Sequence, residues 1–422
     1  MNCNIEDHFS RSTFLKAGVG GLMGVLLGSS PLRAAQELVR KVQAKRCILL
    51  WMSGGPSQMD TWDLKPGTTN GGTFKSIRTR VPGIRISEHL PKLAAEMRDL
   101  AVIRSMTSRE GNHDRASYLV HTGYSPQATV KHPSLGSMVS FEMGDPNFEL
   151  PNFVSLNGGS RGPGFLGPEH RPLVIRNPGG PPENLSPRGI DRTRQHKRML
   201  LLQEFEKSFE KTHNNSAVEA HRDVYEKAQR LMESRLAKAF DISGAGRSAQ
   251  AAYGLDNSFG RGCLVARRLV GVGVPFVEVQ LGGWDTHREN FDAIQRLSSM
   301  LDPAFASLVR DLRADGLLDE TLVIWMGEFG RTPRINANVG RDHFPRAWSA
   351  VVAGGGISGG QVIGETSDDG MEVKENPVHV PDLFASIAYA FGIDHTKELV
   401  TPEGRPITFV DKKAKIIPQL FG

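Results

Sequence analysis

Two continuous apolar runs near the middle of the chain, each followed at once by glycine and acidic residues, form the most informative pattern in the sequence. Residues 275–281 read PFVEVQL and lead into GGWDTH, and residues 321–326 read TLVIWM and lead into GEFGRTP. Such runs are typical of strands that are buried on both faces of a parallel sheet. Because ligands of open α/β proteins bind at the carboxyl ends of these strands, we expect the polar residues that follow each run to form a site.

The rest of the hydrophobic pattern predicts further strands and helices in alternation. Short apolar runs predict strands at residues 47–52, 100–104 and 347–353, and a hairpin or edge strand at residues 359–364. Apolar residues at helical spacing predict helices at residues 91–98, 259–271, 288–313 and 381–391. Alternation of this kind is typical of an α/β protein.

Residues 151–245 interrupt the alternation. Up to residue 190 the segment is rich in proline and glycine, which predicts an irregular excursion over the site. The following residues are highly charged and predict a helical hairpin, which would serve as a cap or as an interaction surface. Its two apolar faces consist of Leu202, Phe205 and Phe209 and of Val224, Ala228 and Leu231.

The residues after the strands are of the types that bind metals. Asp285 and His287 are two positions apart, so on an extended segment their side chains point to the same side. Asp342 and His343 repeat this pair, and Glu328 lies between the two pairs along the chain. Carboxylate oxygen with imidazole nitrogen suits zinc, manganese or iron. The alternative is that Asp285 caps the following helix and His287 packs locally.

Two loops that follow other predicted strands add candidates. The loop after residues 47–52 supplies Asp60 as a further metal ligand and Ser57 as a helper or nucleophile, although Asp60 is also a common turn residue. The loop that enters the next helix contains His113 and Arg115. Backbone N–H groups at a helix start and a guanidinium group both favour an anion. A capping or surface role is the alternative for His113.

The composition of the chain is that of a globular protein and excludes several classes of binding site. The 422 residues are 39% hydrophobic and 23% charged, as in a globular protein with one large or two ordinary domains. The net charge is +5, but residues 1–46 hold seven basic and three acidic residues, so the remainder is near neutral. With no basic stripe, no nucleic-acid partner is predicted. The three cysteines have no metal or disulfide spacing, and the glycines form no nucleotide-binding motif.

The first 35 residues have the layout of an export signal. A polar start, SRSTFLK, is followed by a glycine-rich apolar core of about 14 residues and by small residues near a cleavage point. The core is too short to span a bilayer, and no transmembrane span is predicted elsewhere. The start is similar to a twin-arginine signal, with Ser12 in place of the second arginine. We therefore expect export to the periplasm or cell envelope; the alternative is a helical arm.

Short motifs along nearly the whole chain resemble a large exported bacterial family, family fifteen-oh-one of the domains of unknown function. The motifs are GGPS at 54–57, DTWD at 60–63, NH at 112–113, HPSLG at 132–136, GFLGP at 164–168, GGWDTH at 282–287, WMGEFGRTP at 325–333 and GRDH at 340–343.

That family resembles the alkaline phosphatase and sulfatase superfamily. The resemblance implies one α/β domain at residues 36–422, with a mostly parallel central sheet, helices on both faces, metal at the strand ends and an insertion at about 151–245. Three departures are visible. GEFG stands where Asp-His-Gly is expected, the sulfatase motif C-x-P-S-R is missing, and the loop at 112–115 has no serine or threonine nucleophile. The resemblance therefore implies one metal site rather than two.

Together these features predict an exported metal-dependent hydrolase of phosphate or sulfate esters, including esters on carbohydrates. Zinc or manganese would activate a water molecule or polarise the ester. The expected ligands are Asp285, His287 and His343, with Glu328, Asp342 or Asp60 completing the shell. Arg331 and Arg115 would neutralise the transferring group, and His113 would act as general acid.

The alternative is a non-catalytic binding subunit of a cell-envelope complex. Such a protein would keep the phosphatase-like fold without the nucleophile and would dock on an envelope protein through the helices at about residues 190–240.

Overall fold

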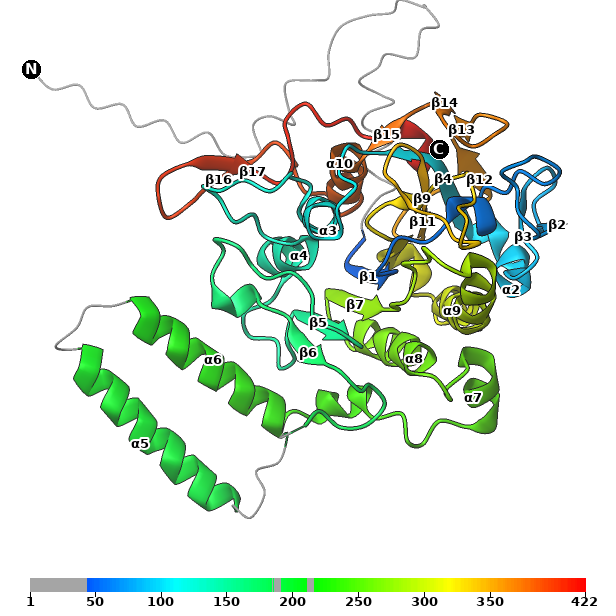
Figure 1. Ribbon diagram of the computed structural model, residues 1–422. Coiled ribbons are helices and arrows are strands. Elements are labelled where there is room, and N and C mark those ends of the chain that lie inside the picture. Colours follow the sequence, from blue (N-terminus) through cyan, green and yellow to red (C-terminus); the bar gives the residue numbers. More distant parts are fainter. Residues whose placement is uncertain (1–43, 184, 186–190, 211–215) are drawn as a thin grey trace, which may run out of the picture. The chain divides into compact units, whose positions relative to one another are not determined.

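The computed structural model describes residues 44–183, 185, 191–210 and 216–422. The predicted export signal at residues 1–35 lies outside the described residues. From Ala44 onward the chain is built around one large sheet (Figure 1).

Nine strands of the described chain form this central sheet. They are β1 Arg46–Trp51, β4 Leu100–Thr107, β5 Phe153–Leu156, β6 Leu173–Ile175, β7 Phe276–Gln280, β8 Thr321–Met326, β11 Trp348–Ala353, β12 Gln361–Ile363 and β15 Val378–His379. Their order is β12-β4-β11-β8-β1-β7-β5-β6, with β15 also paired to β4. All pairings are parallel except those of β11, which is antiparallel to β4 and β8. The predicted strands are confirmed, and all but β11 end at the same edge.

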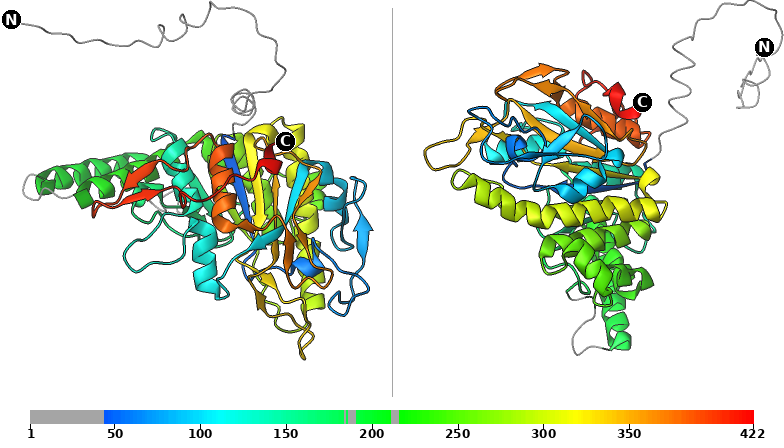
Figure 2. Two further views of the ribbon diagram at one scale, coloured as in Figure 1. Left: turned by 90° about the horizontal axis from the view of Figure 1, so that it is seen from above. Right: turned by 90° about the vertical axis from the view of Figure 1, so that its right-hand side faces the viewer.

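Helices cover both faces of the sheet (Figures 1 and 2). One face packs against α2 Pro91–Ala95, α8 Ser258–Gly271 and α9 Asn290–Ala314. The other packs against α3 His113–Thr122, α4 Leu135–Met143 and α10 Val380–Ala390. The four predicted helices are present, and the mostly parallel α/β architecture is confirmed. None of the described helices is long and apolar enough to cross a membrane.

Strand β1 explains why the central strands read as continuous apolar runs. Successive side chains of a strand point to opposite faces. Ile48 and Leu50 belong to the core on the α8 and α9 side, whereas Leu49 and Trp51 belong to the core on the α3 and α10 side. Because both faces are covered by helices, neither set can be polar.

The reversed strand β11 brings a further loop to the edge where the parallel strands end. It is preceded by β10 His343–Phe344, which pairs with β9 Gly330–Arg331 in the segment that follows β8. Since β11 begins where β8 ends, the residues just before β11 reach the same edge as the residues just after β8. His343 and Arg331 are thereby paired directly across the β9–β10 ribbon.

The segment predicted as an insertion at about 151–245 is divided differently in the structure. Strands β5 and β6 belong to the central sheet, where β5 pairs with β7 and β6 forms the edge. The predicted helical hairpin is present as α5 Arg192–Glu210 and α6 Ser216–Glu233 (Figure 1). The proline- and glycine-rich part therefore builds the sheet's edge as well as loops.

We predict that Asp302 of α9 stabilises the start of α2. Its carboxylate accepts hydrogen bonds from the backbone N–H groups of Leu93 at 2.8 Å and Lys92 at 3.0 Å. Asp302→Ala should lower the free energy of unfolding by about 1–3 kcal/mol, because it leaves these donors without their acceptor. Urea denaturation measures this change. Gln295→Ala, at an exposed position of the same helix, is the matched control, and equal effects of the two changes would contradict the capping role.

Candidate metal centre

The carboxyl edge of the sheet brings together residues that are far apart in the sequence. Asp285 and His287 follow β7, and Glu328 lies between β8 and β9. His113 begins α3 after β4, and His343 begins β10. Each of these residues either follows the end of a strand or begins the next element at the same edge of the sheet. The sequence pattern predicts this arrangement for a shared site.

The three histidine rings at this edge present their two nitrogens in the same way. Each Nδ1 lies within hydrogen-bond distance of an oxygen that only accepts, so each Nδ1 carries a proton, and in the neutral form of the ring each Nε2 keeps its lone pair. The acceptors are Glu328 Oε1 for His113 (2.7 Å), Asp342 Oδ1 for His287 (2.6 Å) and the carbonyl oxygen of Gly111 for His343 (2.8 Å).

The three Nε2 atoms converge on one carboxylate oxygen, Oδ1 of Asp285. The distances to this oxygen are 3.3 Å from His113, 3.1 Å from His287 and 3.3 Å from His343. The Nε2 atoms of His287 and His343 are themselves 3.0 Å apart. Lone pairs that face one another at such distances repel unless a proton or a cation lies between them. A cation relieves all these contacts together, whereas one proton relieves a single pair.

The four separations given above resemble those between the ligands of a tetrahedral zinc site. Bonds of about 2.0–2.1 Å to zinc place the ligand atoms roughly 3.3 Å from one another, and the distances here are 3.0–3.3 Å. Nε2 of His113 is buried and has no hydrogen-bond partner among the described residues. The donor atoms of His113, Asp285 and His343 lie within 4.8 Å of one another. The residues present therefore fit a divalent cation, and zinc and manganese both accept this donor set.

Glu328 and Asp342 lie behind the rings. The buried Oε1 of Glu328 also accepts a hydrogen bond from the backbone N–H of Gly54 at 2.9 Å, which fixes its position. Carboxylates that hold Nδ1 in this way orient a histidine and make its Nε2 a better metal ligand. The sequence predicted Glu328 and Asp342 as ligands and His113 as general acid. The structure instead places the carboxylates on Nδ1 and His113 among the converging Nε2 atoms.

The charges around Asp285 keep its carboxylate ionised. Burial raises the pKa of Asp285, but the hydrogen bond and charge of Arg331, with the charges of neighbouring histidines, outweigh burial and hold this pKa at about 2. The hydrogen bond to Glu328 raises the pKa of His113. Burial lowers the pKa of His343, which favours the neutral ring that metal binding requires.

Arg331 is fully buried, and its N–H groups donate hydrogen bonds to acceptors within the protein. It donates to the carbonyl oxygens of Gly55 at 2.9 Å, Arg341 at 3.1 Å and Gly54, and to Oδ1 of Asp285. These bonds occupy four of the five N–H donors of a guanidinium group. Arg331, predicted to contact the transferring group, therefore joins three loops and neutralises Asp285.

Asp60 and Ser57 belong to a separate buried network. Ser57 donates its hydroxyl hydrogen to Oδ2 of Asp60 at 2.5 Å, and the same oxygen accepts from Asn290 at 2.8 Å. The guanidinium of Arg341 binds both carboxylate oxygens, at 2.8 and 3.1 Å. Asp60, Ser57 and Arg341 are fully buried. Asp60, predicted as a ligand, is thus neutralised by Arg341, and the hydroxyl of Ser57, predicted as a nucleophile or helper, is engaged and shielded from solvent.

The predicted anion site at the start of α3 is filled by residues of its own loop. Asn112 caps the helix, and its side-chain oxygen accepts hydrogen bonds from the backbone N–H groups of Asp114 at 3.1 Å and Arg115 at 3.3 Å. The guanidinium of Arg115 binds both carboxylate oxygens of Glu110 at 2.7 Å. Arg115 therefore forms an exposed ion pair, and the helix N-terminus is capped internally.

At two positions in the predicted motifs only glycine fits, because the backbone of another loop approaches too closely to leave room for a side chain. Gly54 has a φ of +113°, and a Cβ atom there would lie 2.4 Å from the backbone nitrogen of Asp285. A Cβ atom on Gly340 would lie 1.9 Å from the carbonyl oxygen of His287. Any side chain at either position would push apart the backbone segments that carry the converging residues.

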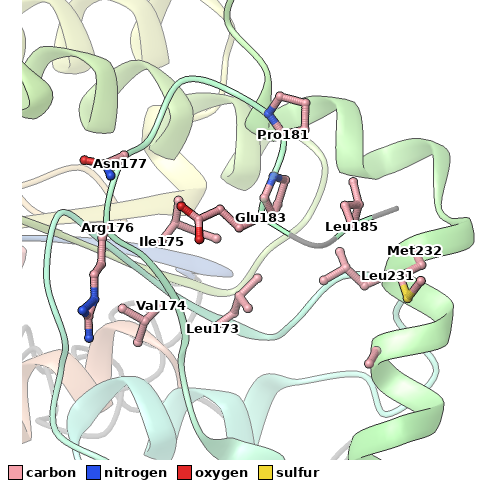
Figure 3. A pocket seen from close by; sticks show the side chains of 12 residues that line it. Leu173, Val174, Ile175, Arg176, Asn177, Pro181, Glu183, Leu185, Leu231 and Met232 are labelled. Carbon is pink, nitrogen blue, oxygen red and sulfur yellow. The ribbon is translucent and has the colours of Figure 1, made fainter. Parts of the chain in front are cut away.

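Two hollows of the described surface lie away from this cluster. One, of about 370 Å³, lies between edge strand β6 and helix α6, with Leu173, Ile175 and Leu231 among its apolar lining residues (Figure 3). A second hollow of about 310 Å³ shares Leu173 and Leu231. Neither contains a predicted site residue. The converging residues instead form an open cluster, in which the side chains of His113 and Asp285 are 36% and 47% exposed.

Sequence reasoning missed three contributors to this edge. The Phe329 ring packs under two histidines, with centroids 5.0 Å from His113 and 4.6 Å from His343. Arg341 neutralises Asp60, and a backbone carbonyl orients His343. Phe329 and Arg341 lie within the motifs GEFG and GRDH, so their positions could have marked them as residues of the site. Their burial and their contacts could not be inferred from the sequence. A backbone acceptor leaves no sequence signal at all.

Comparison with known families gives one match. The model of the family described as "Protein of unknown function (DUF1501)" matches residues 44–421. The match covers nearly all of the described chain and confirms the family resemblance seen in the motifs. No curated protein matches the chain.

Solved structures to which this chain has a low similarity include a sulfatase and alkaline phosphatases. Ps i-CgsB is 13% identical, with a TM-score of 0.38 and coverage of 83% of this chain and 73% of that chain. PsFucS1 sulfatase from Pseudoalteromonas sp. is 15% identical, with a TM-score of 0.35 and coverage of 86% and 70%. The alkaline phosphatase of the Antarctic bacterium TAB5 is 11% identical, with a TM-score of 0.35 and coverage of 84% and 99%.

We predict that Asp60 acts through stability rather than as a metal ligand. Asp60→Asn removes the charge that compensates buried Arg341, so the metal-free protein should lose about 3–5 kcal/mol of unfolding free energy. Denaturation in the presence of a chelator measures this loss. Asp342→Asn, at a half-exposed carboxylate, should cost less than about 1 kcal/mol under the same conditions. If the two variants were equally stable without metal, the buried pair would not have this role.

Proposed function

This chain belongs to the DUF1501 family, and we propose that it is an exported, metal-dependent hydrolase of phosphate or sulfate esters. The observation that supports the proposal most directly is the convergence of three histidine Nε2 atoms on Oδ1 of Asp285. We assign the metal to His113, His287, His343 and Asp285. Glu328 and Asp342 are assigned to positioning His113 and His287 rather than to the metal.

The assigned residues would act as follows. A divalent cation at this position would lower the pKa of a bound water toward neutrality and polarise an ester oxygen. Glu328 and Asp342 hold protons on the Nδ1 atoms, so that the Nε2 atoms remain free to bind. Arg331 keeps Asp285 ionised and fixed. The partial exposure of the cluster leaves room for an ester to approach from solvent.

The nucleophile we propose is water. Ser57, the hydroxyl candidate from the sequence, is buried and bonded to Asp60. A water molecule needs no side chain beside the cluster and reaches it from solvent. This assignment also agrees with the departure of the 112–115 loop from the pattern of enzymes that use a serine or threonine.

The formal charges of the proposed centre favour singly charged esters. A divalent cation and Arg331 supply three positive charges, and Asp285, Glu328 and Asp342 supply three negative ones. A centre whose charges cancel offers no net compensation for a second negative charge on the substrate, and that charge still loses hydration on binding. Sulfate monoesters and phosphodiesters carry one negative charge, whereas a phosphate monoester carries nearly two at neutral pH. We therefore place the first two classes ahead of the third.

A non-catalytic binding role is the second candidate. It is favoured by the burial of Ser57 and by the internal use of Arg331 and Arg115, which leaves the cluster without an identified side-chain nucleophile or anion clamp. In that role the protein would retain its metal and act in a cell-envelope complex. Metal binding without turnover on any ester would select this candidate.

Export to the periplasm or cell envelope is part of the proposal and rests on the sequence of residues 1–35. Zinc or manganese is the proposed metal, and a small or carbohydrate ester is the proposed substrate.

We predict that protein purified without added metal contains close to one zinc or manganese per chain. His113→Ala, His287→Ala and His343→Ala should each remove it, because each deletes one of the converging Nε2 atoms. Asp342→Ala should weaken binding about 10–100-fold, as loss of an orienting carboxylate does. Elemental analysis and chelator competition measure these effects.

His395→Ala is the matched control, because this histidine lies outside the cluster, and its metal content should equal that of the parent. Thermal unfolding in chelator shows whether each variant is folded. Full metal content in all three cluster variants would exclude the assigned site, and with it the hydrolase.

We predict that the metal-loaded protein cleaves an aryl sulfate or a diaryl phosphate at least about tenfold faster than an aryl phosphate monoester, a difference of about 1.4 kcal/mol in barrier. Release of the chromogenic aryl alcohol measures each rate. His287→Ala should abolish release, and His395→Ala should not. A preference for the monoester would overturn the charge argument while leaving the metal site in place.

A further inference from the structure

Helix α5 carries an exposed apolar patch that its own chain leaves uncovered in the described structure. Leu200, Leu201 and Phe205 are 49%, 57% and 65% exposed. They lie in the middle of a 19-residue helix whose only substantial helix partner among the described elements is α6. Large apolar side chains grouped on an exposed helix are typical of an interaction surface.

Charges are segregated to the two halves of α5 on either side of this patch. Residues 191–198 contain four basic and one acidic residue besides a histidine, and residues 204–210 contain three acidic residues and one lysine. The helix dipole favours acids in the first turn and bases in the last, which is the reverse of this arrangement. The segregation therefore costs helix stability, and interaction with another molecule is the more direct explanation for it.

We propose that α5 packs antiparallel against α5 of a second copy of this chain about a twofold axis near Leu201. In an antiparallel pair the basic half of each helix faces the acidic half of its partner, whereas a parallel pair would place like charges together. A twofold interface requires a surface that complements itself, and this helix meets that requirement.

The positions around Leu201 agree with this register. Arg198 and Glu204 lie three residues on either side of it, so antiparallel packing places Arg198 of each copy opposite Glu204 of the other. Leu201 and Phe205 lie on one helix face because they are four residues apart. Arg198 and Glu204 flank the same face because each is three residues from Leu201. Within its own helix Glu204 pairs with the exposed Lys207 at 3.4 Å, which is a weak surface pair that can exchange.

The expected dimer is moderate in affinity. One helix from each copy provides an interface at or below the usual range of roughly 1,200–2,000 Å², so we expect association in the micromolar range. Because exposed ion pairs are screened by salt, dimerisation should weaken as ionic strength rises. The inference is independent of catalysis and holds for either proposed function.

A charge exchange tests the proposal with the whole purified chain in sedimentation equilibrium. Arg198→Glu should weaken dimerisation by about tenfold or more, because the twofold axis turns two attractions into two repulsions. Adding Glu204→Arg to this variant should restore the parent dissociation constant to within about threefold. Leu201→Gln, which keeps a good helix former, should also weaken the dimer by removing central apolar contact.

Arg247→Glu, an exposed reversal of the same size on another helix, is the matched control and should leave the dimer unchanged. Far-UV circular dichroism shows that α5 remains folded in each variant. A chain that stays monomeric at about 100 μM, or a dimer that Arg198→Glu leaves unchanged, would overturn the proposal. Slow hydrogen exchange around Leu201 in a monomeric chain would also overturn it, because another segment or another protein would then cover the patch.

Discussion

The edge of the sheet that carries the converging histidines depends on one buried guanidinium group. Arg331 has no contact with solvent, so its charge must be balanced and its N–H groups must be bonded within the protein. It meets this condition by binding carbonyl groups after β1 and before β10 and the carboxylate after β7. Three loops are thereby fixed by the protein itself. The position of Asp285 is a consequence of this requirement and needs no bound metal to explain it.

The sequence predicted most of the fold because its signals were local and strong. Residues 321–326 and 275–281 are long apolar runs with glycine at their ends, and both became central strands. Strands β5 and β6 are only four and three residues long and lie among prolines and glycines, so no periodic pattern could develop in them. Their place in the sheet depends on pairing with β7, which is a contact between residues more than 100 positions apart.

The site was predicted by residue type but not by role. Asp285, Glu328, Asp342 and the histidines were all recognised as metal-binding types, and the structure brings them to one edge. Sequence spacing cannot distinguish a carboxylate that binds a cation from one that holds the Nδ1 proton of a histidine, because both uses suit the same residue. Asp60 shows the same limit: a buried arginine 281 positions away decides its function.

The long separations within the cluster have a consequence for how the protein would acquire the proposed metal. His113 is bonded to a residue 215 positions later, and His343 contacts a residue 56 positions earlier. No nascent fragment can assemble the proposed ligands, so a cation would be captured only after nearly the entire chain has been synthesised and packed. Protein ligands of this kind discriminate poorly between zinc and other first-row metals on affinity alone. If the proposed site is occupied, the cellular compartment in which folding is completed, and the ions available there at that moment, would therefore determine which element it holds.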